Sequence, residues 1–135
     1  MKNIKFLAFV LIIIVLLSCN KITHHNIPDP TLNTPVITNV EDAYTYTINA
    51  HAFSDSLSGI LDFSSDETVI TYTVLNYSQG SADLKIDNAA STTIYNDMIE
   101  NNVVLVESLH EKPHQIELVL ENFTGLLELV LACEN

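Results

Sequence analysis

Histidine is the residue type in this chain that most readily does chemistry, because its side chain binds metals and carries protons near neutral pH. Five histidines are present. His24 and His25 are adjacent in a segment where nothing fixes a third ligand, and His51 falls on the polar side of an alternating run. His110 and His114 flank a proline and could share a zinc ion, but a structural site needs four ligands and no CxxC pair supplies the others. We predict no metal site and no cofactor.

Serine and cysteine are the candidate nucleophiles, and neither has a recognisable activating partner. A nucleophilic serine or cysteine needs an adjacent base, and this chain, with only three glycines, contains no Gly-x-Ser-x-Gly turn. Cys133 ends an alternating run on the same side as Leu131, which predicts a buried, inert thiol. We therefore predict that the protein is not an enzyme.

Carboxylates are the most abundant charged groups, with 17 Asp and Glu residues. Paired carboxylates hydrolyse glycosides, and clustered oxygens bind calcium. The acids fall in expected turns or on the polar sides of expected strands, and no D-x-[DN]-x-[DN]-G loop is present. A solvated acidic surface explains this distribution, and a calcium-binding module is the alternative. The acids concerned include Asp62, Asp66, Glu67, Asp83 and Asp87.

A carbohydrate-binding surface is the other alternative. Sandwich domains that bind sugars usually do so through exposed flat aromatic rings, and this chain has no tryptophan. Alternation assigns Tyr44, Tyr46 and Phe63 to the inner sides of strands. Tyr77 and Tyr95 remain as candidate outward rings.

The elements that position these residues are short runs in which apolar and polar residues alternate with period two. Clusters of Ser, Asn, Asp and Gly separate the runs. Several short strands at roughly ten-residue spacing predict an all-β fold, namely a single antiparallel β-sandwich. The clearest runs lie at 44–52, 67–77, 82–86, 116–120 and 127–133.

Residues 98–110 fit a helical stripe as well as a strand. Met98, Val103 and Val106 belong to that stripe. We favour a strand because Asn101-Asn102 and the β-branched Val103-Val104 lower the helix propensity.

The second half of the chain resembles small bacterial sandwich domains of the jelly-roll or immunoglobulin-like kind. In such domains a glycine or proline starts a strand, and an Asn/Ser-x-x-Gly hairpin leads to the last one. Gly80, Pro113 and Asn122-Phe123-Thr124-Gly125 stand at the corresponding places here. The resemblance implies a fold and no activity.

The N-terminus resembles the signal peptide of bacterial lipoproteins. Lys2 and Lys5 precede twelve apolar residues, 6–17, which end in the lipobox-like Leu16-Leu17-Ser18-Cys19. As a helix these twelve residues reach about 18 Å, well short of the roughly 30 Å hydrocarbon core. The resemblance implies cleavage before Cys19 and acylation of Cys19, the predicted lipidation site, which leaves Cys133 as the single thiol of the mature chain.

The charge of the chain excludes several classes of partner. The net charge is -12, there is no arginine, and removal of 1–18 takes away Lys2 and Lys5 and leaves about -14. Nucleic acids need clustered Lys and Arg, so we exclude them, and electrostatic docking on anionic lipid is excluded likewise. The expected division is a signal peptide at 1–18, the lipidated cysteine and a flexible tether at 19–35, and a β-sandwich at 36–135.

These features predict a lipoprotein of the bacterial cell envelope, held to the membrane by its acyl chains. Asn20 is not the aspartate that retains lipoproteins at the inner membrane in some bacteria, so the outer membrane is preferred. The expected role is non-catalytic binding or assembly through contact with a protein of unknown identity. The alternative is a carbohydrate- or calcium-binding surface module.

Overall fold

The structure is a computed structural model that describes residues 31–134. The predicted signal peptide, Cys19 and His24-His25 lie outside these residues. The described chain is all-β, as predicted, and none of it forms a helix that could cross a membrane. Its strands are β1 (Val36–Val40), β2 (Ala43–Ile60), β3 (Thr68–Asp87), β4 (Thr93–Ile99), β5 (Val103–Leu109) and β6 (Gln115–Cys133).

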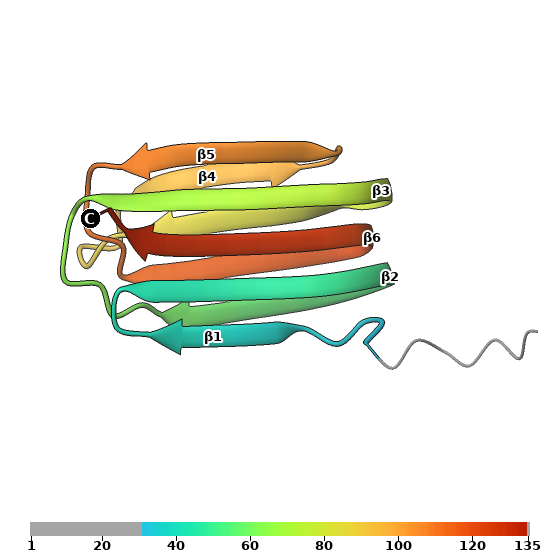
Figure 1. Cartoon of the computed structure of the whole chain (residues 1–135), viewed down its shortest axis with the longest axis horizontal. Helices are drawn as coiled ribbons and strands as arrows, with labels where there is room; N and C mark the ends of the chain where they lie inside the picture. The colour runs from blue at the N-terminus through green and yellow to red at the C-terminus, as the bar shows by residue number, and fades with distance from the viewer. Residues whose placement is uncertain (1–30, 135) are drawn as a thin grey trace, which may run out of the picture.

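Three long strands turn a single antiparallel sheet into two layers. β2, β3 and β6 have 18, 20 and 19 residues, and each bends near its middle, so that its halves lie in opposite layers (Figure 1). The front layer has the order β1, first half of β2, second half of β6, first half of β3, β5. The back layer has the order second half of β2, first half of β6, second half of β3, β4. This is the strand order of a jelly roll. Of the two sandwich types expected, the jelly roll therefore fits and the immunoglobulin-like type does not.

The bends lie at one end of the sandwich, which we call the corner end. Register shifts interrupt the pairing of β2 with β6 after Ala50 and of β3 with β6 after Leu75. Ala52, Asn76 and Asn122 adopt φ values of 48°, 55° and 49° there. A residue with positive φ turns a strand out of its plane, as in a β-bulge. The loops 61–67, 88–92 and 110–114 lie at the opposite end, which we call the loop end.

The core fills the space between the layers, and period-two alternation sets its composition. The predicted inner residues Tyr44, Tyr46 and Phe63 are buried. The alternation of β2 ends at Ala50, and Ala52 is exposed because the strand bends at that point. The largest fully buried side chains also include Tyr72, Phe123, Ile48, Ile70, Leu84, Ile86, Ile99, Ile116 and Leu118.

Residues 98–110 are strand and not helix, as favoured from the sequence, but a turn at 100–102 divides the expected single strand in two. They contribute the end of β4 in the back layer and all of β5 in the front layer, joined at the corner end (Figure 1). Both strands pair with β3, which crosses from one layer to the other in the same way.

The end of the expected tether belongs to the folded domain. Asn33 donates its backbone N–H to Asn49 O at 2.8 Å, and its side-chain Oδ1 accepts the His51 N–H at 2.7 Å. Leu32 forms a bridge with Asn49. Paired backbone therefore begins before the expected boundary at Val36.

Candidate functional site

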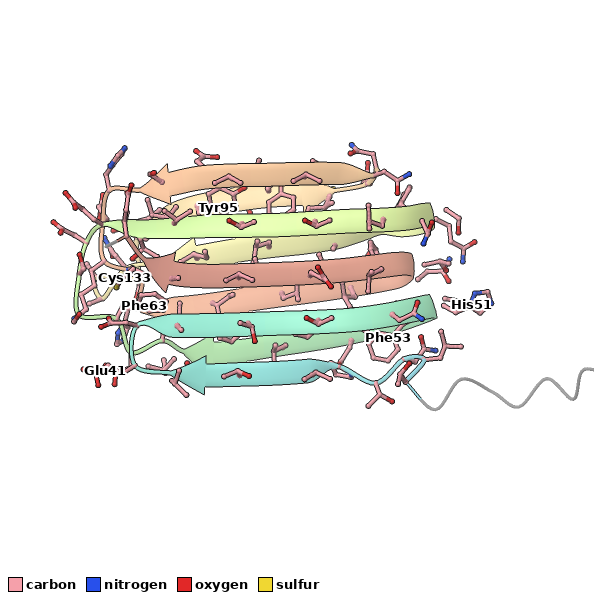
Figure 2. The ribbon with its side chains drawn as sticks, viewed as in Figure 1. Glu41, His51, Phe53, Phe63, Tyr95 and Cys133 are labelled. Carbon is pink, nitrogen blue, oxygen red and sulfur yellow. The ribbon has the colours of Figure 1, made fainter. Side chains whose placement is uncertain are left out.

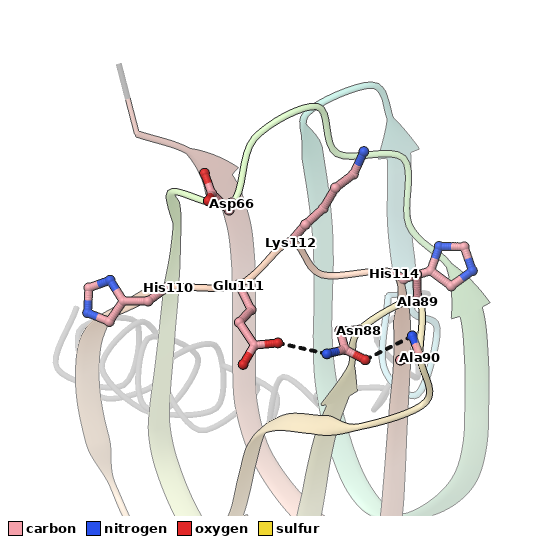
Figure 3. Close-up of a pocket in the computed structure, with 8 residues that line it drawn as sticks. All are labelled: Asp66, Asn88, Ala89, Ala90, His110, Glu111, Lys112 and His114. Atoms are coloured by element: carbon pink, nitrogen blue, oxygen red, sulfur yellow. Dashed lines mark hydrogen bonds between the residues drawn. The ribbon is translucent and has the colours of Figure 1, made fainter.

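A hollow of about 520 Å³ opens at the loop end, among the three loops (Figure 3). Lys112 and the predicted candidates His110 and His114 line it, together with Asp66 and Glu111. The rings of His110 and His114 point to opposite sides of the hollow, so the structure does not bring them together as a zinc pair (Figure 3). Within residues 31–134, no three His, Cys, Asp or Glu side chains are placed to hold a metal ion.

Two polar side chains of this hollow, Asn88 and Glu111, hold its own loops. Asn88 Nδ2 donates to Glu111 Oε2 at 2.7 Å, which ties loop 88–92 to loop 110–114. Asn88 Oδ1 accepts the backbone N–H groups of Ala90 and Thr92, both at 3.0 Å. These bonds form an Asx-type turn. Asn88 therefore shapes the loop end.

His51 lies far from the other two described histidines. It is exposed at the corner end, as predicted, whereas Cys133 and the hollow are at the loop end (Figure 2). The three described histidines therefore form no common site.

Cys133 packs against the core but is only half-buried, and not fully buried as predicted, because it is the last residue of β6 at the open loop end; it is also bonded to an acid. Its Sγ donates to Asp42 Oδ1 at 3.1 Å, and Ser64 donates to the same carboxylate through its N–H at 2.6 Å and its hydroxyl at 2.8 Å. The Ser64 bonds hold the pKa of Asp42 below its ordinary value. Burial raises the pKa of the Cys133 thiol, and its bond to Asp42 raises that pKa further. The reactive thiolate is therefore disfavoured.

We expect native Cys133 to react with a maleimide at least about tenfold more slowly than the unfolded chain, because the thiolate carries the reaction. The measurement is the modification rate of soluble residues 20–135 with and without denaturant. Asp42→Ala, which removes the partner, is expected to speed the native reaction. Equal rates for the native and unfolded chain would contradict the expectation of an inert thiol.

The two tyrosines expected as outward rings pack against the core instead. The ring of Tyr77 lies against Phe123, with centroids 6.0 Å apart, and its hydroxyl donates to Gly80 O at 2.7 Å. Tyr95 is half-buried between the layers (Figure 2). Neither ring is outward, because the positive φ of Asn76 reorients Tyr77, and Tyr95 is paired with Ile86 and so shares the inward side of that buried residue.

The most unusual surface is the outer side of the front layer, which we call the Thr–Val face. Six of the nine large hydrophobic side chains that are exposed lie on it, and Val104 and Val106 are each 68% exposed. Of the fifteen positions in its three full rows, only Glu128 is charged. The rows are Val36-Thr47-Glu128-Thr73-Val104, Thr38-Thr45-Val130-Thr71-Val106 and Val40-Ala43-Ala132-Val69-Ser108.

The outer side of the back layer has the opposite character. Asp83, Asp87 and Glu117 lie on it together with Lys85. Lys85 Nζ and Asp87 Oδ2 form an ion pair at 2.8 Å. Many acids of residues 31–134 therefore lie on the outer side of the back layer or in the loops, and the three full rows of the Thr–Val face contain no acid other than Glu128.

We expect the acidic groups to respond to ionic strength and not to calcium in particular. A specific calcium site would add about 2.7 kcal/mol of stability at a hundredfold excess over Kd, whereas diffuse charge is screened alike by any salt. The measurement is a thermal melt of residues 20–135 in calcium, magnesium and sodium salts of equal ionic strength. A rise of several degrees in calcium alone, reversed by a chelator, would contradict this expectation.

Comparison with known proteins gives no relative from which to assign a site. No family model matches the chain, and a search of curated proteins found no match.

Proposed function

We propose that this protein is a lipid-anchored binding module of the bacterial cell envelope, non-catalytic, which contacts another protein through the Thr–Val face. The lipobox-like Leu16-Leu17-Ser18-Cys19 supports the anchor, and Asn20 favours the outer membrane. The single observation that supports the binding surface is the concentration of exposed valines, separated by half-buried threonines, on one largely uncharged side of a strongly acidic domain. Exposed apolar residues gathered on one side of a soluble domain are typical of an interaction site.

The face is large enough for a weak or transient contact. Five strands about 4.8 Å apart and about seven residues of about 3.3 Å each give roughly 550 Å². Covering it with a matching partner would bury about 1,100 Å² in total, near the lower end of specific protein–protein interfaces.

The proposal is tested by photo-crosslinking of the full chain in the cells that produce it. A benzophenone amino acid is placed at Val130, at the centre of the Thr–Val face, or at Val119, which lies on the same strand but on the back layer. We expect a discrete protein adduct from position 130 and none from position 119. Absence of an adduct at 130, or equal adducts at both positions, would contradict the proposed contact.

A further inference from the structure

Glu128 occupies the middle of the Thr–Val face. It lies on β6, the third of the five strands in the front layer, with Thr47 on one side and Thr73 on the other in the same row. Val130 is the next outward residue along the strand. Glu128 is exposed, and its side-chain carboxylate forms no hydrogen bond or ion pair with any of residues 31–134. Within the described part of the chain, Glu128 is therefore an unpaired carboxylate in a neutral surface.

A partner that covers the face must satisfy this carboxylate. A charge removed from water without a counter-charge is strongly unfavourable, and the hydroxyls of Thr47 and Thr73 could donate hydrogen bonds but carry no charge. A guanidinium or ammonium group would supply both the charge and the donors. Arginine suits this place best, because its planar fork can bond both carboxylate oxygens while its stem covers neighbouring valines.

We propose that the partner protein presents a basic side chain, arginine by preference, over Glu128, and that this pair is the energetic centre of the contact. This inference rests on the proposed function, since it names the chemistry of the partner at the same face. The net charge of -12 favours the same kind of partner, because it attracts basic proteins over a distance and repels acidic ones. Binding hot spots cluster near the centre of an interface and are enriched in arginine, and the near-neutral contacts around them exclude water.

Two other occupants fit the face less well. A second copy of this domain would bring another Glu128 and no arginine, and its Lys85 is paired with Asp87 on the opposite outer side, while its Lys112 lies in a loop-end segment. A lipid surface is disfavoured because the rows of the Thr–Val face contain neither the cationic nor the aromatic residues that membrane interfaces favour.

The test uses the full chain with the benzophenone amino acid at Val106, two strands away from Glu128. Glu128→Gln and Glu128→Lys are compared with Glu117→Gln and Glu117→Lys, which make the same changes on the same strand but on the back layer. We expect Glu128→Gln to lower the adduct yield at least about tenfold and Glu128→Lys to abolish it, because loss of one member of a buried pair weakens binding strongly. Both Glu117 variants should retain the yield. Thermal melts of all four variants confirm that each one folds.

The partner residue is then identified by mass spectrometry of the crosslinked peptide. We expect an Arg or Lys near the crosslink, and its replacement by Glu should restore the adduct with Glu128→Lys. An adduct that survives Glu128→Lys would overturn the basic partner and leave the binding surface intact. An adduct with a second copy, or with residues 20–30 of the same chain, would overturn it as well. Loss of every adduct from the Thr–Val face, even with Glu128 intact, would overturn the proposed function too and indicate that Glu128 only keeps the face soluble.

Discussion

Replacing Cys19 with serine is expected to abolish incorporation of labelled palmitate and to leave either uncleaved precursor or a released soluble form. The physical reason is that the acyl chains supply the attachment, at about 0.8 kcal/mol per buried CH₂, and a single chain binds only marginally. With a net charge of about -14 and three lysines after the predicted cleavage, the chain has little electrostatic attraction of its own for anionic lipid. The measurements are palmitate labelling and membrane fractionation.

Cys133→Ser is the matched control for this experiment, because it removes the other thiol of the chain. It should keep full labelling and full membrane attachment. Labelling that persists in Cys19→Ser would show that the lipidation site lies elsewhere and would remove the anchor from the proposed function.

The period-two alternation was sufficient to predict the fold class and much of the core. Tyr44, Tyr46 and Phe63 are buried as expected, because an inward side chain at every second position is a local property of a strand. The absence of a helix at 98–110 followed from Asn101-Asn102 and the β-branched residues beside them, which are also local signals, although the two asparagines form a turn between two strands. Such signals extend over a few residues and do not depend on the partner strand.

The Thr–Val face could not be predicted in the same way, because strand pairing creates it. Taken one strand at a time, Thr45 and Thr47 are the polar side of β2, and Thr71 and Thr73 are the polar side of β3. The face becomes continuous only because β6, distant in sequence, lies between these strands and brings Glu128 to the centre. No local pattern indicates that β6 will pair with both.

The corner end shows the same limit for individual side chains. Bulges at Ala52, Asn76 and Asn122 break the alternation, so that Tyr77 turns towards Phe123 although simple alternation predicts an outward ring. The bond from Cys133 to Asp42 joins residues 91 positions apart. A short stretch of sequence does not indicate where a bulge will form, and it does not include a partner as distant as Asp42.

Gly80→Ala is expected to be the most destabilising small substitution at the corner end. Gly80 has a φ of 81°, which L side chains rarely adopt, and an added methyl group would overlap the backbone carbonyls of Asn122 and Glu121. Positive φ and overlap with backbone that cannot rotate away together give an expected loss of roughly 3–5 kcal/mol. The loss is large for a domain of this size, because such domains have about 5–15 kcal/mol of stability.

The matched control is Gly59→Ala on the same sheet. A methyl group at Gly59 would meet its nearest atom, Ile116 Cγ2, at an ordinary 3.8 Å, and its φ is not positive. We expect a change below about 1 kcal/mol there. Urea unfolding of soluble residues 20–135, followed by tyrosine fluorescence and circular dichroism, measures both variants. The expectation is contradicted if the free energies of unfolding of Gly80→Ala and Gly59→Ala differ by less than about 1 kcal/mol. In that case β3 and β6 do not pack backbone against backbone at the corner end, and the bend that divides the sheet into two layers must have another cause.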